Sequence, residues 1–168
     1  MQNLKLPITI DPYRSAVRKL ECEGYFDVSR MERLLAATNS CSERINVSVK
    51  FDIDEFGVKF MKGQGSLIAT LTCQRCNEVF DHELAIDFTF SPVKDAEAAD
   101  ALPSYYEAIE FDENGEINLC ELVEDELLLE IPLFPKHSLK DCPAPADSVW
   151  GELPKEQDKP NPFDVLKQ

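Results

Sequence analysis

Hydrophobic and polar residues alternate with a period of two through the middle of the chain, which predicts a series of β-strands. In residues 45–53, Ile, Val, Val, Phe and Ile alternate with polar residues. Because strand side chains point alternately to opposite faces, the apolar residues share one face. Related runs follow at 58–61, 67–73 and 80–90. We therefore expect an antiparallel meander with one buried face, in which Gly63 and Gly65 bracket a reversal of the chain.

Apolar residues recur at helical spacing in three other stretches. An Asp-Pro pair at 11–12 is typical of a helix start and predicts a helix over residues 12–20. Ser29, three residues before Glu32, forms a capping-box pattern that opens a second helix, which ends near residue 39. Asn118 is placed to cap a third helix, which runs to about residue 130 and is stopped by a proline.

These elements predict an α+β fold, namely an antiparallel β meander with two or three flanking helices and an extended, proline-rich C-terminal tail. Seven of the 11 prolines fall between Pro132 and Pro162, which disfavours regular structure there. We expect a single α+β domain over residues 1–150 and an extended tail that can be mobile over residues 151–168.

The net charge of -15 is concentrated in one segment of the chain. Between Asp95 and Glu130 there are 13 acidic residues and no Lys or Arg. Such a segment repels phosphates and attracts basic partners such as ribosomal proteins, although it is also typical of a solvated face that keeps a protein soluble. The chain has no N-terminal apolar signal and no membrane-spanning run, so we expect a cytoplasmic protein with reduced thiols.

Cys73 and Cys76 form a Cys-x-x-Cys motif between two predicted strands. A redox pair of the thioredoxin kind needs its first cysteine at a helix N-terminus, and the alternation after Cys76 does not favour one. A zinc knuckle on a tight turn fits the pattern better, and Asn77 tolerates the left-handed conformation that such a turn needs. An ordinary hairpin with two buried thiols remains the alternative.

A structural zinc ion takes four ligands, and His137 with Cys142 supplies the two that a knuckle lacks. The predicted set is therefore Cys73, Cys76, His137 and Cys142, which would fasten a tail poor in apolar residues. His82 competes as a ligand, but a histidine on the apolar face of a strand is more typical of a hydrogen-bonded core residue. Four protein ligands close a zinc site, and no phosphate loop or hydrolase motif occurs, so we expect no enzyme.

Five segments of the chain resemble the YceD family, also called large ribosomal RNA subunit accumulation proteins. They are LPITIDPYR, TCQRCNEVF, FSPV, VEDELLLEIPLFPKHSLKDC and KPNPF, in the same order over essentially the whole chain. The resemblance implies a non-enzymatic bacterial factor needed for accumulation of 23S ribosomal RNA. It also places His137 where some relatives carry cysteine, which is the exchange expected of a metal ligand.

The distribution of charged residues along the chain suggests two ways in which the protein could support accumulation of ribosomal RNA. In the first, the acidic helix contacts a basic protein, such as a large-subunit ribosomal protein or a ribonuclease, and the effect on RNA is indirect. Its candidate contact residues are Glu121, Glu124, Asp125, Glu126 and Glu130. In the alternative, the protein is a zinc-knuckle protein that binds RNA directly through its basic N-terminal region. The basic residues of that region are Lys5, Arg14, Arg18, Lys19, Arg30 and Arg33. Neither requires a membrane.

Overall fold

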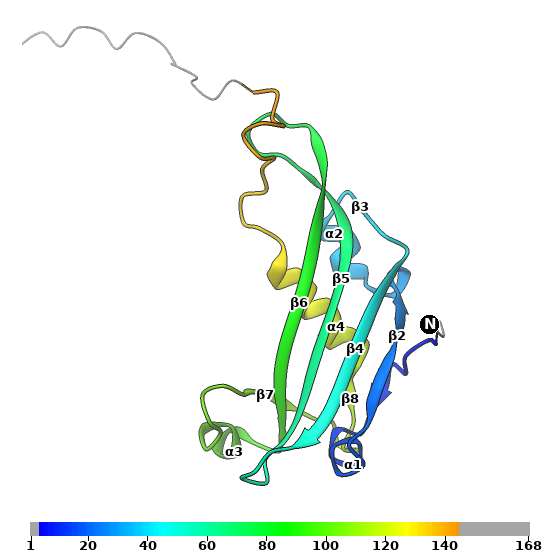
Figure 1. The fold of residues 1–168 in the computed structure, drawn as a ribbon, viewed down its shortest axis with the longest axis vertical. Helices are drawn as coiled ribbons and strands as arrows, with labels where there is room; N and C mark the ends of the chain where they lie inside the picture. The colour runs from blue at the N-terminus through cyan, green and yellow to red at the C-terminus, as the bar shows by residue number, and fades with distance from the viewer. Residues whose placement is uncertain (1–3, 145–168) are drawn as a thin grey trace, which may run out of the picture.

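A computed structural model describes residues 4–144 of the chain (Figure 1). The predicted tail at 151–168, and the predicted end of the domain at residue 150, lie outside the described residues. Within them the fold is α+β, with long antiparallel strands on which the helices pack, as the sequence predicts.

The main sheet has the strand order β2-β4-β5-β6-β7. Its members are β2 (Glu21–Asp27), β4 (Arg44–Ile53), β5 (Lys59–Thr72), β6 (Val79–Val93) and β7 (Glu107–Glu110), with the short β3 (Ser40–Cys41) beside β5. The pairs from β2 to β6 are antiparallel, which confirms the predicted meander. In contrast, β7 runs parallel to the end of β6. A separate two-stranded sheet joins β1 (Thr9–Ile10) to β8 (Ile117–Asn118).

The described helices are α1 (Pro12–Val17), α2 (Glu32–Ala37), α3 (Ala96–Asp100) and α4 (Leu119–Glu130), with a 3-10 turn η1 (Val28–Arg30) before α2. In Figure 1, α4 crosses one face of the sheet behind β5 and β6, and it packs on β6 and α2. The buried strand side chains on this face include Ile45, Val47, Val49, Phe51, Met61, Leu67, Leu84, Ile86, Phe88 and Phe90. The polar side chains that alternate with them lie on the opposite face of the sheet.

Two predicted segments are shorter or more regular than expected. Helix α1 ends at Val17 rather than residue 20, because Lys19 takes a positive φ of 50° that ends the helical path. The acidic segment after Asp95, for which the sequence pattern predicts no helix, contains α3, whose first turn is capped by the Asp95 carboxylate accepting the Ala98 N–H at 2.9 Å.

The prediction that Gly63 and Gly65 bracket a reversal is wrong, since both lie inside the continuous strand β5. Gly63 is paired with Phe88 of β6, and a Cβ on Gly63 would lie 2.1 Å from the Phe88 ring. A Cβ on Gly65 would lie 2.8 Å from the Asn46 carbonyl oxygen. The glycines therefore mark close packing within the strand, which the sequence pattern alone does not distinguish from a turn.

We expect Gly63→Ala to destabilise the fold by about 1–3 kcal/mol, because the added methyl group overpacks the site held by the Phe88 ring. Urea unfolding measures the free energy of unfolding for the single variants and for the double variant with Phe88→Leu. The smaller leucine should relieve the clash, so the two losses should combine to less than their sum. Strictly additive losses would contradict this account of Gly63.

Candidate metal centre and acidic surface

The Cys-x-x-Cys motif forms the turn that joins β5 to β6. The Cys73 N–H donates to the Glu78 carbonyl at 2.8 Å, and the Asn77 N–H donates to the Cys73 carbonyl at 2.8 Å. Asn77 has a φ of 62°, as the sequence analysis expects for this position. The turn lies in a strand–turn–strand setting, not at a helix N-terminus, so the geometry is that of a knuckle.

The segment after α4 runs back to this turn. The Gln74 N–H donates to the Pro135 carbonyl at 2.9 Å, which fixes the segment beside the hairpin. Farther along, the N–H groups of Asp141 and Cys142 donate to the Ser138 carbonyl at 3.2 and 3.1 Å, which closes a short turn. This turn brings His137 and Cys142 to the two cysteines of the hairpin.

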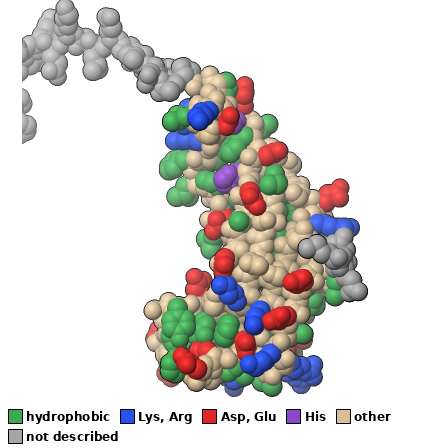
Figure 2. Space-filling model, in the orientation of Figure 1, with side chains coloured by type: hydrophobic (Ala, Val, Ile, Leu, Met, Phe, Trp, Pro, Cys, Tyr) green, Lys and Arg blue, Asp and Glu red, His purple; other side chains and the backbone are tan. Residues whose placement is uncertain are grey.

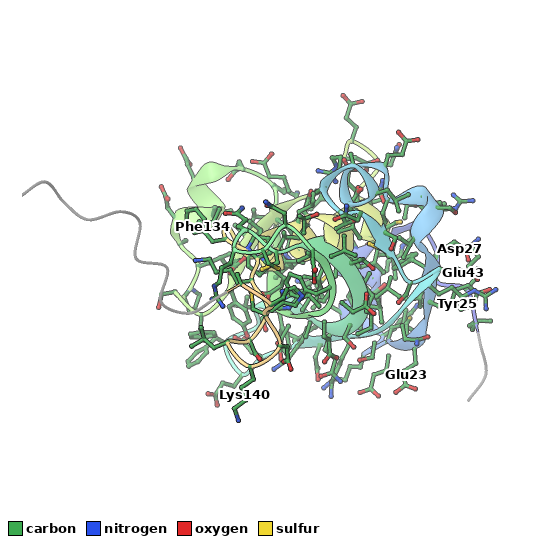
Figure 3. The ribbon with its side chains drawn as sticks, turned by 90° about the horizontal axis from the view of Figure 1, so that it is seen from above. Glu23, Tyr25, Asp27, Glu43, Phe134 and Lys140 are labelled. Atoms are coloured by element: carbon green, nitrogen blue, oxygen red, sulfur yellow. The ribbon has the colours of Figure 1, made fainter. Side chains whose placement is uncertain are left out.

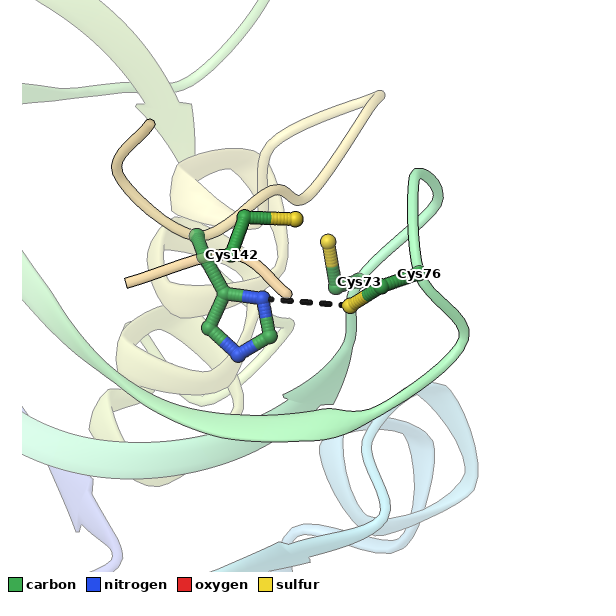
Figure 4. Close-up of side chains that lie close together, drawn as sticks. Cys73, Cys76 and Cys142 are labelled. Carbon is green, nitrogen blue, oxygen red and sulfur yellow. Dashed lines mark hydrogen bonds between the residues drawn. The ribbon is translucent and has the colours of Figure 1, made fainter. Parts of the chain in front are cut away.

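All four predicted ligands therefore meet in one place (Figure 4). The sulfur atoms of Cys73, Cys76 and Cys142 and a ring nitrogen of His137 lie within 4.8 Å of one another. Cys76 Sγ is 3.4 Å from His137 Nδ1. Tetrahedral zinc with ordinary bond lengths separates a thiolate sulfur and an imidazole nitrogen by about 3.5 Å, so the donor set fits the ion. His82 is not part of this cluster.

The electrostatics at the turn favour a thiolate at Cys73. Burial raises the pKa of this thiol, but N–H groups of His137, Arg75 and Cys76 outweigh it and hold the pKa at about 5. The pKa of Cys76 is raised by burial and by the neighbouring thiols of Cys73 and Cys142. Three sulfur groups this close together repel one another once ionised, and a bound cation removes that repulsion.

The acidic helix is confirmed as α4, with the Asn118 side chain accepting the Glu121 N–H at 3.1 Å. Of the five predicted contact residues, Glu121, Asp125 and Glu130 are exposed and Glu126 is half-buried. Glu124 is only 6% exposed. The prediction that Glu124 contacts a partner is therefore wrong for this structure, because its carboxylate is already used inside the protein.

The Glu124 side chain, which belongs to α4, binds the N-terminus of the neighbouring helix α2. Its carboxylate accepts the backbone N–H groups of Arg33 at 2.8 Å and Leu34 at 3.1 Å, and the Arg33 guanidinium at 2.9 Å. The predicted capping box is therefore wrong: Ser29 lies in η1, the helix begins at Glu32, and no side chain at its N-cap position accepts a bond. A carboxylate 91 residues away caps the helix instead.

A second group of carboxylates combines residues of α4 and β7. The pKa of Glu126 is raised, first by partial burial and then by the charges of Glu107, Asp125 and Glu130. Glu107 belongs to β7, so the acidic surface combines a helix and a strand. We use the name acidic surface for Glu107, Glu126 and Glu130. The sequence pattern does not predict Glu107 as a member, because its proximity to Glu126 depends on the parallel docking of β7 beside β6.

The basic residues of the N-terminal region are largely neutralised by nearby carboxylates. Lys5 pairs with Asp27, Arg14 with Asp11 at 3.5 Å, and Lys19 with Asp52 at 3.0 Å. Arg33 binds Glu124, as described above, and it also binds Asp125. Four of the six predicted basic residues are therefore ion-paired within the chain, which weakens the case for a basic RNA-binding face.

No helix among residues 4–144 is both long enough and apolar enough to cross a membrane. A search of solved structures finds no match to this chain.

The family profile described as large ribosomal RNA subunit accumulation protein YceD matches residues 61–168. A protein of Haemophilus influenzae that bears the same name is 44% identical over 168 residues, which is 99% of this chain and 97% of the relative. The chain therefore belongs to the YceD family of large ribosomal RNA subunit accumulation proteins.

Proposed function

We propose that this protein is a non-enzymatic factor that supports accumulation of 23S ribosomal RNA by binding a basic protein through its acidic surface. The family and the name of the relative support the ribosomal role. The observation that carries the rest is that burial, and then the charges of Glu107 and Glu130, raise the pKa of Glu126, while none of these three carboxylates forms an ion pair within the described residues. A large-subunit ribosomal protein or a ribonuclease has the basic chemistry that this surface fits.

The raised pKa of Glu126 gives a physical reason for such a partner. Carboxylates that repel one another and are partly buried gain the most when a Lys or Arg side chain approaches. A basic partner would remove this repulsion at the moment of binding. Attraction between opposite charges would also speed its association at low salt.

In the same proposal, Cys73, Cys76, His137 and Cys142 bind one structural zinc ion. All four positions are taken by protein ligands, which leaves no place for a substrate or an activated water. Of residues 131–144 only Cys142 is buried, so the segment has little core packing of its own to hold it. A metal that joins it to the hairpin turn supplies the missing attachment. We use the name zinc clasp for these four residues.

The rival proposal, direct RNA binding through the N-terminal region, is less well supported. Only Arg18 and Arg30 of its six residues lack an ion pair in the described part of the chain. Direct binding would need those pairs to open, at a cost that a preformed basic face does not have. A salt-dependent shift of 23S ribosomal RNA by the isolated protein would favour the rival.

The proposal is tested by reversing the charge of the acidic surface. The double variant Glu126→Lys with Glu130→Lys should capture at least about tenfold less of the basic protein from a ribonuclease-treated extract at low salt. Glu43→Lys is the control, because Glu43 is exposed and belongs to neither α4 nor β7; Figure 3 labels it on the side of the molecule opposite Phe134. Glu124 is left intact, since its reversal would also damage the fold. Equal capture by all three proteins would contradict the proposal.

A neutral variant separates binding from stability. Because the pKa of Glu126 is raised by folding, the charged form is disfavoured in the folded state, and Glu126→Gln should raise the free energy of unfolding at neutral pH. The advantage should shrink as the pH falls through the pKa of folded Glu126, where the native side chain becomes protonated. Urea unfolding at several pH values measures it. A variant that is more stable yet captures less partner would locate the loss in binding.

A further inference from the structure

The main sheet has two long outer edges, one along β2 and one along β6, and they differ in how the rest of the chain covers them. The outer edge of β2 is bridged at Tyr25 by the chain itself, since the Tyr25 N–H donates to the Leu4 carbonyl at 3.0 Å and the Leu6 N–H to the Tyr25 carbonyl at 3.1 Å. In contrast, β7 pairs only with residues 90–93 of β6. Residues 79–89 of β6 have a strand neighbour on the β5 side alone within residues 4–144. Within residues 4–144 the β2 edge is therefore bridged at Tyr25, whereas the β6 edge is open over residues 79–89.

The hydrogen bonds of the hairpin show which peptide groups face the open edge. The Cys73 N–H bonds the Glu78 carbonyl, and bonded pairs alternate along an antiparallel ladder. The even-numbered residues of β6, such as Leu84 and Ile86, therefore bond to β5. The N–H and carbonyl groups of Asp81, Glu83, Ala85 and Asp87 point to the open edge. None of these outward groups has a hydrogen-bond partner in the described part of the chain.

The side chains at the open edge are acidic. Asp81, Glu83 and Asp87 are exposed, and Figure 2 shows carboxylates spread along the length of the molecule. Asp81 accepts the Thr70 hydroxyl at 2.9 Å, and Asp87 lies 3.7 Å from the exposed Lys62 ammonium group. Glu83 has no ion-pair partner among the described residues. At its β7 end, the edge adjoins Glu107 of the acidic surface.

We propose that the open edge of β6 binds an extended, basic segment of the partner protein as an additional β-strand. Strand addition supplies main-chain hydrogen bonds to the outward groups between Asp81 and Asp87. Lys or Arg at alternate positions of the segment would then lie across from the acidic side chains of β6, where opposite charges on paired strands attract. This inference rests on the proposed function, and it names the place and the backbone conformation of the bound segment.

A second copy of this chain fits the edge less well. Two β6 strands paired around Ala85 would bring carboxylates of both copies onto the same stretch of one sheet face. Glu83 of one copy would lie across from Asp87 of the other, and like charges directly opposite are destabilising. Charged side chains on an open edge are also a known means of preventing pairing between identical sheets. A basic strand removes this repulsion, whereas a second copy doubles it.

The test is a variant that removes one outward N–H and leaves the ladder to β5 intact. Ala85→Pro does this, since proline is tolerated on an edge strand where its nitrogen faces outward. The probe is a short, fluorescently labelled peptide in which lysine and valine alternate, and anisotropy measures its binding to the full chain. Ala85→Pro should weaken binding by at least about tenfold. Ala85→Thr, which keeps the N–H, should bind as the wild type does.

A second probe separates strand addition from simple charge attraction. N-methylation of alternate residues of the peptide keeps its charge but blocks its main-chain donors, so its binding should be lost. Equal binding of both peptides, or no effect of Ala85→Pro, would overturn the inference. Sedimentation that shows a dimer lost in Ala85→Pro would assign the edge to a second copy and also overturn it.

The same variants keep the two proposals apart. If Glu126→Lys with Glu130→Lys abolishes capture of the natural partner and Ala85→Pro does not, the proposed function stands and strand addition fails. If only Ala85→Pro abolishes capture, the edge is the binding site and the acidic surface is not. Unfolding curves for Ala85→Pro and Ala85→Thr check that both retain the fold.

Discussion

Replacing Cys73 by serine is expected to abolish the binding of one equivalent of zinc. Cys73 is buried, its pKa is held at about 5, and its sulfur lies within 4.8 Å of the other three ligand atoms. Loss of a residue that merely supports a ligand costs about 10–100-fold in metal affinity, so loss of the thiolate itself should cost more. Metal analysis of protein purified without chelator measures the zinc content of both proteins.

The same substitution should release residues 131–144 while the sheet stays folded. The core side chains of β4, β5 and β6 are buried by one another and by the helices, whereas this segment contributes only Cys142 to the interior. Hydrogen exchange should therefore speed up at the Gln74 N–H, which bonds the Pro135 carbonyl, and remain slow in the centre of β5. Exchange that speeds up equally in both places would show that the zinc clasp holds the whole fold.

Two further variants make the result specific. Cys22→Ser is the matched control, because Cys22 lies on β2 outside the cluster and should keep a full equivalent of zinc. His137→Cys should also keep zinc, because four thiolates form an ordinary structural site. A wild-type protein without metal would contradict the zinc clasp and leave the turn as a hairpin with buried thiols.

The strands and the meeting of three cysteines with His137 in one cluster were predictable because their signals are local or chemical. Alternation in residues 45–53 and 80–90 is a property of neighbouring residues, and it predicts both the strands and their buried face. The knuckle required only a turn between two such strands. His137 and Cys142 lie more than sixty residues from Cys73, yet thiols and imidazole are uncommon enough that their residue type pointed to the same site.

The errors of the sequence analysis have a common physical cause, which is contact between residues far apart in the chain. Gly63 is typical of a turn when the sequence is considered alone, but in the structure it leaves room for the Phe88 ring beside it. The sequence around Ser29 resembles a helix cap, but the carboxylate that accepts the N–H groups at the start of α2 belongs to Glu124 of α4. In the sequence, Glu124 does not differ from the other acidic residues of its helix, whereas in the structure its side chain is buried against α2. Glu107 joins the acidic surface only because β7 docks parallel to β6.

Glu124→Ala is expected to lower the free energy of unfolding by about 3 kcal/mol. Removing one member of a buried ion pair typically costs 3–5 kcal/mol, and the lower end applies because the Arg33 side chain is 49% exposed. The variant also leaves the backbone N–H groups of Arg33 and Leu34 without an acceptor at the start of α2. Urea unfolding of the wild type and the variant measures the loss.

The neighbouring residue Glu121 provides the control, because it lies on the same helix and is exposed. Glu121→Ala should change the free energy of unfolding by no more than about 0.5 kcal/mol. Glu124→Gln should fall between the two, since its amide oxygen can still accept one backbone N–H but carries no charge for Arg33. A Glu124→Ala loss no larger than that of Glu121→Ala would contradict the cap. A loss near the expected value would show that the acidic helix uses the Glu124 carboxylate to hold α2, so that this charge is not available to a partner.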